Sequence, residues 1–435
     1  MNEMSRRPAA TLPPLLPDEP DHPRHRQRAG PFGVLDIGTT KIACLIGRTE
    51  SDGTLRVLGF GWQKARGVRG GNITDLAEAV AAIRTCVGQA EDMADIRLRS
   101  VTVNLTCGQP ESRLYNVQWA VGGRQVEDRD IRGVVNEGRA RTAADGRDAI
   151  HTMPQQFAVD ATDQVEDPRG LFCTTLNARL HVIDAAATAI RTLKTCMAQC
   201  DLEIEELVSA PMAAGLSILV DDERKLGTTV IDMGGGTTGM AVFADGQLLH
   251  TAQLPIGGLH VTKDIAAGLS TTLVHAERLK TLYGNVQSSP DDEREMLMVP
   301  IVGEEDHQLA RIPRSQVVNI IRPRIEETFE YVKDRLDSAG LQRAAGNRVV
   351  LTGGACQLAG VRDLAARMLG RQVRLGRPVQ LRGLPEMATG PAFATASGLL
   401  SWATGAGRGF QDMDMEEERP SGLLRRIVNF LKERV

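Results

Sequence analysis

Two short segments, nearly two hundred residues apart, share one design and restrict the possible folds more than any other feature of the chain. The first is Gly-Val-Leu-Asp-Ile-Gly-Thr-Thr at residues 33–40, and the second is Val-Ile-Asp-Met-Gly-Gly-Gly-Thr-Thr at residues 230–238. Each contains an apolar strand, an aspartate, a glycine turn with two threonines and the start of another strand. A design that recurs at this separation predicts duplicated α/β domains that face each other.

The chemistry of the two turns suits a chain of phosphates. Glycine lets backbone N–H groups approach phosphate oxygens without a Cβ atom in the way, and threonine adds hydroxyl donors. Asp36 and Asp232 end their strands, where they can hold Mg²⁺ through its water ligands, and Lys41 can neutralise a terminal phosphate. The candidate phosphate-binding residues are Gly38, Thr39, Thr40, Lys41, Gly234, Gly235, Gly236, Thr237 and Thr238.

A third glycine turn follows the apolar strand predicted at residues 348–351. It consists of Gly353, Gly354 and Ala355, and a nucleoside can lie against its backbone. Each turn alone could be an ordinary tight connection, but the three in this order favour a nucleotide site between two domains. The sequence contains no G-x-x-x-x-G-K-[ST] loop, and no G-x-G-x-x-G follows the first strand. These absences argue against a P-loop NTPase and a dinucleotide-binding fold.

Length and composition narrow the class of protein further. A chain of 435 residues is too long for one core, so two or more domains are expected. Aromatic residues make up only 3% and the net charge is -4, so we expect no nucleic-acid partner. The seven cysteines form no C-x-x-C pair and have no histidine cluster beside them, which predicts reduced thiols and no zinc site built on cysteines. No apolar run reaches the roughly 18–20 residues that a spanning helix needs.

The patterns along the chain predict an α/β fold with two similar domains and an α+β insert. The predicted division is a disordered, proline-rich basic tail (1–30), a first domain (31–101 plus 181–225), an insert (102–180), a second domain (226–258 plus 340–403) with a smaller subdomain (259–339), an acidic linker (404–420) and a terminal amphipathic helix (421–435).

The three turns resemble the two phosphate motifs and the adenosine motif of the superfamily of actin, the heat-shock chaperones and the sugar kinases. Within it, residues 31–435 resemble the FtsA family of bacterial cell-division proteins. Four features favour that family: Lys41 after the first turn, a connection between residues 58 and 74 too short for the subdomain of actin and MreB, the insert, and the basic terminal helix behind an acidic linker. The resemblance implies an actin-like two-domain ATPase fold that binds ATP and Mg²⁺.

The resemblance also implies which residues would contact the base of the nucleotide and which positions would bear on its hydrolysis. It places the adenine-contacting helix at residues 274–280, where Glu277 and Lys280 would bracket the ribose and base. As a bare pattern these two residues are equally well a surface ion pair. Gly239 stands where many relatives have an aspartate, and Ala210 stands where the chaperones and MreB have a glutamate. Because hydrolysis needs a polar group that orients water, we expect weak or absent ATPase activity.

The last fifteen residues have the pattern of a helix that lies in a lipid interface. Leucine, isoleucine and valine recur at helical spacing and form one apolar stripe, with basic residues at its flanks. The alternative is a helix that docks on its own protein. Each basic residue contributes roughly 1 kcal/mol near an anionic leaflet, so one copy should bind reversibly and a polymer should bind with high avidity. The candidate membrane-binding residues are Leu423, Leu424, Arg425, Arg426, Ile427, Val428, Phe430, Leu431, Lys432 and Arg434.

The resemblance implies an adaptor at the cytoplasmic face of the cell membrane. Such a protein tethers filaments of the tubulin-like division protein FtsZ, polymerises itself, and contacts later division proteins through its insert. The FtsZ contact would lie in the smaller subdomain, on the helix predicted at 314–339. Its charged candidates, which could equally form a solvated helix face, are Arg322, Arg324, Glu326 and Glu327. The alternatives are a sugar-kinase-like enzyme and a chaperone-like ATPase, and neither of these needs the terminal helix.

Overall fold

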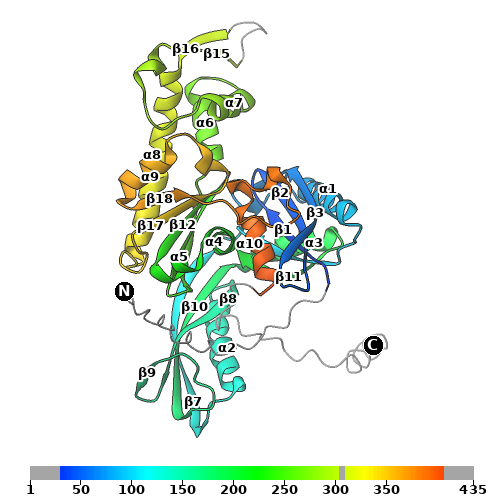
Figure 1. The fold of residues 1–435 in the computed structure, drawn as a ribbon, viewed down its shortest axis with the longest axis vertical. Helices are drawn as coiled ribbons and strands as arrows, with labels where there is room; N and C mark the ends of the chain where they lie inside the picture. The colour runs from blue at the N-terminus through cyan, green and yellow to red at the C-terminus, as the bar shows by residue number, and fades with distance from the viewer. Residues whose placement is uncertain (1–29, 303–308, 406–435) are drawn as a thin grey trace, which may run out of the picture.

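The computed structural model describes residues 30–302 and 309–405. Almost all of the predicted N-terminal tail, most of the acidic linker and the whole predicted terminal helix therefore lie outside the described residues. Two sheets stand at the centre of an elongated molecule, with the insert at one end and the smaller subdomain at the other (Figure 1). Within the described ranges, no helix is both long and apolar enough to cross a bilayer.

The first sheet has five strands in the order β11-β6-β1-β2-β3. Their bounds are β1 (Phe32–Ile37), β2 (Lys41–Thr49), β3 (Leu55–Lys64), β6 (Ser100–Leu105) and β11 (Glu203–Ser209); β4 (Val68–Arg69) and β5 (Asn72–Ile73) form a separate short hairpin. Helices α1 (Leu76–Ala94) and α3 (Ala187–Gln199) cover the outer face of the sheet. Asp75 caps α1, because it precedes the helix and its side chain accepts from the Glu78 N–H at 3.0 Å.

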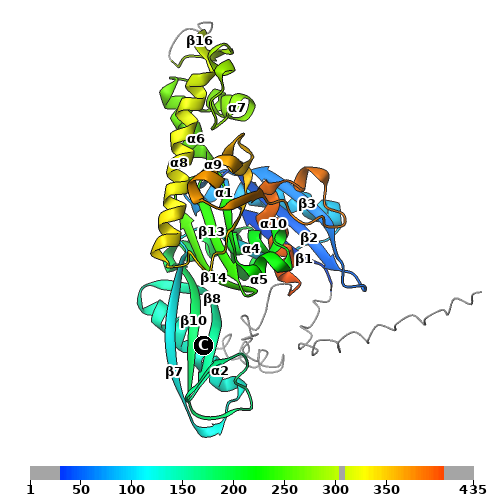
Figure 2. The ribbon, with the colours of Figure 1, turned by 60° about the vertical axis from the view of Figure 1, so that its left-hand side comes forward.

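The second sheet has nine strands and continues into the insert (Figure 2). In spatial order they are β18 (Gln372–Leu375), β17 (Arg348–Thr352), β12 (Thr228–Met233), β13 (Thr238–Ala244), β14 (Gln247–Leu254), and then the insert strands β7 (Glu111–Gln125), β10 (Phe172–Ala186), β8 (Arg147–Val159) and β9 (Thr162–Val165). The strand pairing between the two parts consists of Ala252 opposite Glu111, and the Thr251 N–H also donates to Ser112 Oγ at 2.8 Å. Helix α2 (Asp128–Ala144) packs on one face of the insert strands and gives the insert its own core.

A layer of two helices lies between the sheets and joins the two halves. These helices are α4 (Ala210–Ile218) and α10 (Ala394–Ala403), and one apolar cluster contains both of them together with Val34 of the first sheet and Val230 of the second. The helices approach closely, because a Cβ atom on Gly398 would lie 1.7 Å from the carbonyl oxygen of Ala213. The sequence placed α10 in the second domain, but it packs on α4 and on β1 of the first half as well.

The remaining helices cover the second sheet and build the smaller subdomain. They are α5 (Asp221–Leu226), α6 (Gly258–Gly268), α7 (Leu273–Tyr283), α8 (Arg314–Ser338) and α9 (Val361–Leu369), with the hairpin β15 (Met296–Pro300) and β16 (Leu309–Pro313) and the 3₁₀ turns Pro290–Glu293, Gly354–Gln357, Glu386–Ala388 and Pro391–Phe393. Helices α6 and α7 and the hairpin lie beyond the sheet, and α8 runs from them along it (Figure 1).

The insert differs in its limits from the predicted range of 102–180. Strand β6 belongs to the first sheet, so the insert begins after it, and β10 continues to Ala186. Strand β7 alternates between buried and exposed positions along much of its length. Because one face of such a strand is polar, only its short apolar pieces are visible in the sequence.

Candidate functional site

The two phosphate turns have the same backbone geometry. The Gly38 N–H donates to the Lys41 carbonyl at 2.9 Å, and the Gly234 N–H donates to the Thr237 carbonyl at the same distance. The aspartate of each turn lies opposite the residue seven positions later, Ala43 in β2 for Asp36 and Gly239 in β13 for Asp232. The two hairpins are therefore equivalent residue by residue, with Lys41 in the place of Thr237.

The turns also lie against each other. A Cβ atom on Gly235 would be 2.4 Å from Thr40 Cγ2, and one on Gly236 would be 2.4 Å from Thr39 Oγ1. The glycines of the second turn thus make room for the threonine side chains of the first. Thr39 Oγ1 accepts from the Gly71 N–H at 3.1 Å, which leaves its O–H group to donate elsewhere.

Thr238 differs from the other candidates. It pairs with Met233 in the hairpin, the same place that Ile42 takes in the first half, and its side chain is fully buried. Its hydroxyl donates to the carbonyl of Ile256 at 2.8 Å. Thr238 therefore corresponds in the hairpin to Ile42 and not to Thr40, and its buried hydroxyl binds the segment that follows β14 rather than a ligand. Thr237 lies at the turn.

Two carboxylates and one amino group lie together between the turns: Asp36 is buried, and Asp232 and Lys41 are half-buried. Lys41 Nζ lies 3.9 Å from Asp36 Oδ2, and burial raises the pKa of Asp36 while Lys41 opposes that rise. Burial and repulsion from Asp36 raise the pKa of Asp232 to about 6, although Thr395 Oγ1 donates to this carboxylate at 3.0 Å. When both carboxylates are ionised, the single lysine leaves an excess of negative charge, which a divalent cation would offset.

Lys41 is held on its other side by the segment before α10. Its Nζ atom lies 3.5 Å from the centre of the Phe393 ring and donates to the carbonyl of Ala392. Burial lowers the pKa of Lys41, and the charges of Asp36 and Asp232 oppose this. The lysine thus connects the first turn to the segment that leads into α10.

The third turn lies beside the second. Gly353 has φ of +84°, and a Cβ atom there would be 2.4 Å from Asp232 Oδ1. A Cβ atom on Gly258, the first residue of α6, would be 3.2 Å from the Cβ of Ala355, and one on Gly354 would be 3.8 Å from the Cβ of Ala392. The three glycine turns predicted from the sequence therefore meet in one place.

Glu277 and Lys280 form an ion pair at the start of α6. Lys280 Nζ lies 2.7 Å from Glu277 Oε2 and donates to Thr262 Oγ1 at 2.8 Å and to the Gly258 carbonyl at 3.1 Å. The first N–H groups of α6 donate to the carbonyls of Gly234 and Gly235. Glu277 and Lys280 therefore form the ion pair that the bare sequence pattern allowed. The pair lies beside the second glycine turn, where residues that contact the ribose and base would have to lie.

Comparison with known proteins decides the family. The family model described as cell division protein FtsA matches residues 229–398, and the model of the SHS2 domain inserted in FtsA matches residues 108–184. A cell division protein FtsA of Rhizobium meliloti (strain 1021) is 41% identical over 389 residues, which cover 87% of this chain and 88% of the relative. The chain belongs to the FtsA family of cell division proteins.

A more distant member of the FtsA family agrees with this assignment, and solved structures show the fold. FtsA of Escherichia coli (strain K12) is 31% identical over 375 residues, 85% of this chain and 89% of the relative. The PilM-PilN type IV pilus biogenesis complex has a TM-score of 0.63 at 17% identity and covers 86% of this chain and 98% of its own. MreB5 of Spiroplasma citri bound to ADP has a TM-score of 0.52 at 12% identity and covers 87% and 98%. The fold is actin-like, as the resemblance implied.

Two residues of the site in this FtsA family member were missed by sequence reasoning. Asn104 in β6 is buried, accepts from the Ile37 N–H at 2.7 Å and donates to the Ile37 carbonyl at 3.4 Å, so it holds the first turn in place. A lone amide within an apolar strand is a visible signal of such a role. Thr395 lies far along the chain from Asp232, and no local pattern connects the two.

The two positions that bear on hydrolysis lie against each other. A Cβ atom on Gly239 would be 3.1 Å from the Cβ of Pro211, the second residue of α4. A larger side chain at position 239 would therefore press on α4. Ala210, the first residue of that helix, is buried. Glycine at position 239 therefore lets β13 pack closely against the start of α4.

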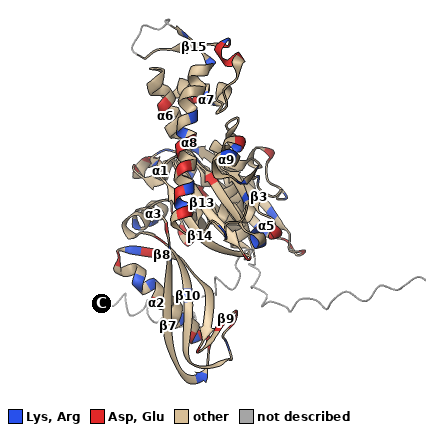
Figure 3. Cartoon of the chain, turned by 90° about the vertical axis from the view of Figure 1, so that its left-hand side faces the viewer, with Lys and Arg blue, Asp and Glu red and all other residues tan. Residues whose placement is uncertain are grey.

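The charged residues proposed for FtsZ contact are already paired. Arg322 Nε lies 2.7 Å from Glu326 Oε1, and Arg324 binds Asp264 of α6 at 2.6 Å and also Glu327. Basic and acidic residues are interspersed along α8 (Figure 3). A partner that used these charges would have to exchange existing ion pairs, so each would contribute little net affinity.

Proposed function

We propose that this chain is an ATP-binding adaptor of cell division that tethers FtsZ filaments to the cytoplasmic face of the membrane at the division site. The observation that carries the proposal is the meeting of two equivalent phosphate turns in a member of the FtsA family. Self-polymerisation, and contacts of the insert with later division proteins, belong to the same proposal.

The residues between the turns fit a nucleotide with Mg²⁺. The backbone N–H groups and Thr39 would hold phosphate oxygens, and Lys41 would face the terminal phosphate. Asp36 and Asp232 would hold Mg²⁺ through water, because the two carboxylates lie close together between the turns and their charge exceeds that of Lys41. Bound ATP would supply phosphates that both halves of the protein grip, and this favours one relative arrangement of the halves.

The membrane contact would come from the predicted helix at residues 421–435, which lies outside the described residues. The first test is co-sedimentation of the full chain, with purified FtsZ, on vesicles containing anionic lipid. A chain that ends at Arg419 should leave both proteins in the supernatant. Ile427→Asp places a charge in the apolar stripe and should weaken binding strongly, whereas Asn429→Asp adds the same charge on the opposite face and should weaken it little.

The outcomes separate the adaptor from an enzyme of the same superfamily. If the truncated chain and Ile427→Asp pellet as well as the full chain, the membrane role of the tail is wrong. If the full chain transfers phosphate from ATP to a small acceptor with repeated turnover, the protein is a kinase-like enzyme and the adaptor function is wrong. FtsZ that pellets with vesicles only when the full chain is present supports the proposal.

A further inference from the structure

The first phosphate turn is hydrogen bonded to the loop that carries β5. The Gly71 N–H donates to Thr39 Oγ1 at 3.1 Å, and the Gly71 carbonyl accepts from Thr106 Oγ1 at 3.4 Å. Gly71 has φ of +81°, and a Cβ atom there would lie 2.5 Å from the Thr106 carbonyl oxygen. The loop therefore fits tightly between the phosphate turn and the place where the chain enters the insert.

The next residue of this loop bonds to the entrance of the insert. Asn72 Oδ1 accepts from the Gly108 N–H at 3.0 Å, and the Gly108 carbonyl accepts from the N–H of Ala186, the last residue of β10, at 2.9 Å. Asn72 thus connects the phosphate turn to both the entry and the exit of the insert. Behind the loop lies a cavity of about 60 Å³, lined in part by Ile37 and Asn72, so the loop has space for a small displacement.

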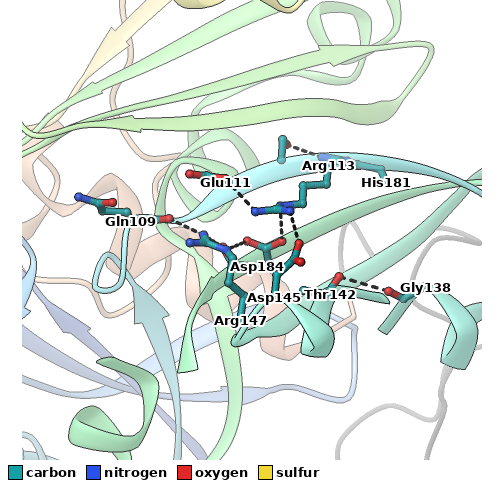
Figure 4. Close-up of polar contacts among 10 residues, drawn as sticks. Gln109, Glu111, Arg113, Gly138, Thr142, Asp145, Arg147, His181 and Asp184 are labelled. Atoms are coloured by element: carbon teal, nitrogen blue, oxygen red, sulfur yellow. Dashed lines mark hydrogen bonds and ion pairs between the residues drawn. The ribbon is translucent and has the colours of Figure 1, made fainter. Parts of the chain in front are cut away.

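A buried cluster of charges holds together the segments where the chain enters and leaves the insert (Figure 4). Asp184 is fully buried, with Arg113 Nε at 3.0 Å from its Oδ2 and with Arg147 bonded to its Oδ1. Arg147 also donates to the Gln109 carbonyl at 2.7 Å, and Arg113 reaches Asp145 beyond the end of α2 at 2.8 Å. Removing one member of such a cluster leaves a buried charge unpaired, so its members are held together.

We propose that Asn72 couples the occupation of the phosphate turn to the orientation of the insert. The proposal rests on ATP binding at the two turns. A phosphate oxygen that accepts from the Thr39 hydroxyl fixes that side chain, and the Gly71 N–H bond fixes the loop with it. Asn72 passes this restraint to Gly108, and the charge cluster carries it to β10 and α2. Asn72 is therefore a positioning residue that does not itself touch the nucleotide.

Linkage makes the coupling reciprocal. If ATP favours one orientation of the insert, any contact that holds the insert in that orientation tightens ATP binding by the same factor. Such couplings are typically about 5- to 150-fold. A filament built through the insert would in this way select for ATP-bound subunits.

Amide hydrogen exchange of the full chain, with and without saturating Mg²⁺ and ATP, tests the coupling. In the unmodified protein ATP should slow exchange at residues 184–187, whose amides lie at the exit of the insert. In Asn72→Ala the nucleotide should still bind, because Asn72 does not touch it, but the ATP-dependent slowing should be lost. Asn72→Asp keeps an acceptor for the Gly108 N–H and should retain it. Asn116→Ala, an exposed asparagine of β7, is the matched control and should behave as the unmodified protein does.

Each outcome bears on a distinct claim. ATP that binds without any change at residues 184–187 overturns the coupling and leaves nucleotide binding in place. If ATP still slows amide exchange at these residues in Asn72→Ala, Asn72 does not transmit the effect of ATP to the insert. A protein that binds no ATP at all overturns the proposed function, and the coupling fails with it. The comparison within the unmodified protein is decisive even if Asn72→Ala does not fold.

Discussion

Asp232 should lower the stability of the nucleotide-free protein at neutral pH. Its pKa rises from 3.8 in a free side chain to about 6 in the folded protein because of burial and the nearby charge of Asp36. The folded state therefore binds this proton more tightly than the unfolded state. The contribution of the group to the free energy of unfolding is largest below pH 3.8 and is lost as the pH rises through about 6.

The magnitude follows from the same pKa. A pKa raised by about two units lowers the free energy of unfolding by about 3 kcal/mol above pH 7 and by about 1.5 kcal/mol at pH 5, because each pKa unit corresponds to about 1.36 kcal/mol. Asp232→Asn keeps the acceptor for Thr395 and cannot ionise. Without nucleotide it should be more stable than the unmodified protein at pH 8 by up to this amount, and the difference should shrink toward pH 4. The measurement is urea unfolding at several pH values.

A control variant and a measurement with bound nucleotide make this test more specific. Asp245→Asn makes the same exchange at an exposed position in a left-handed turn, where asparagine is well tolerated, and serves as the control for the exchange itself. Mg²⁺ with ATP should raise the melting temperature of the unmodified protein more than that of Asp232→Asn. If Asp232→Asn is less stable than the unmodified protein at pH 8, or if the difference does not grow with pH, the electrostatic reasoning fails.

Three further changes test the rest of the site. Gly353→Ala should lower the free energy of unfolding by at least about 1–2 kcal/mol, because φ of residue 353 is +84° and the new Cβ would meet Asp232. Urea unfolding measures this loss, and an unchanged midpoint would contradict the geometry. Lys41→Met should weaken ATP binding by about tenfold or more, since a charge-assisted hydrogen bond contributes about 1.5–3 kcal/mol; equal affinity by calorimetry would remove Lys41 from the site. Asn104→Ala should cost about 1–3 kcal/mol in unfolding free energy, because it leaves the buried Ile37 N–H without its acceptor; a smaller loss would mean that water replaces the amide.

Local chemistry made much of this fold predictable. The two strand-turn-strand units, the cap of α1 at Asp75 and the bounds of α7 follow from glycine turns, capping side chains and helical spacing, which act over a few residues. The approach of the three turns was also predictable, because a repeated design implied domains that face each other.

Contacts between distant segments were not predictable in the same way. Thr395 donates to Asp232 across more than a hundred and fifty residues, and α10 packs on α4 and β1 of the first half. Thr238 looked equivalent to Thr40 until the strand register placed it with Ile42. Register and packing depend on the partner strand or helix, so no single segment contains that information.

The position of α10 has a consequence for the synthesis of the chain. The helix fills the layer between the sheets, where Leu399 and Leu400 pack with residues of β1 and β2, yet it is translated late, after the strands of both sheets. The inner face of the first sheet therefore stays uncovered while more than three hundred residues are still being translated. The N-terminal half cannot finish folding as an independent unit, and a nascent chain released before residue 394 should expose an apolar surface to chaperones or proteases.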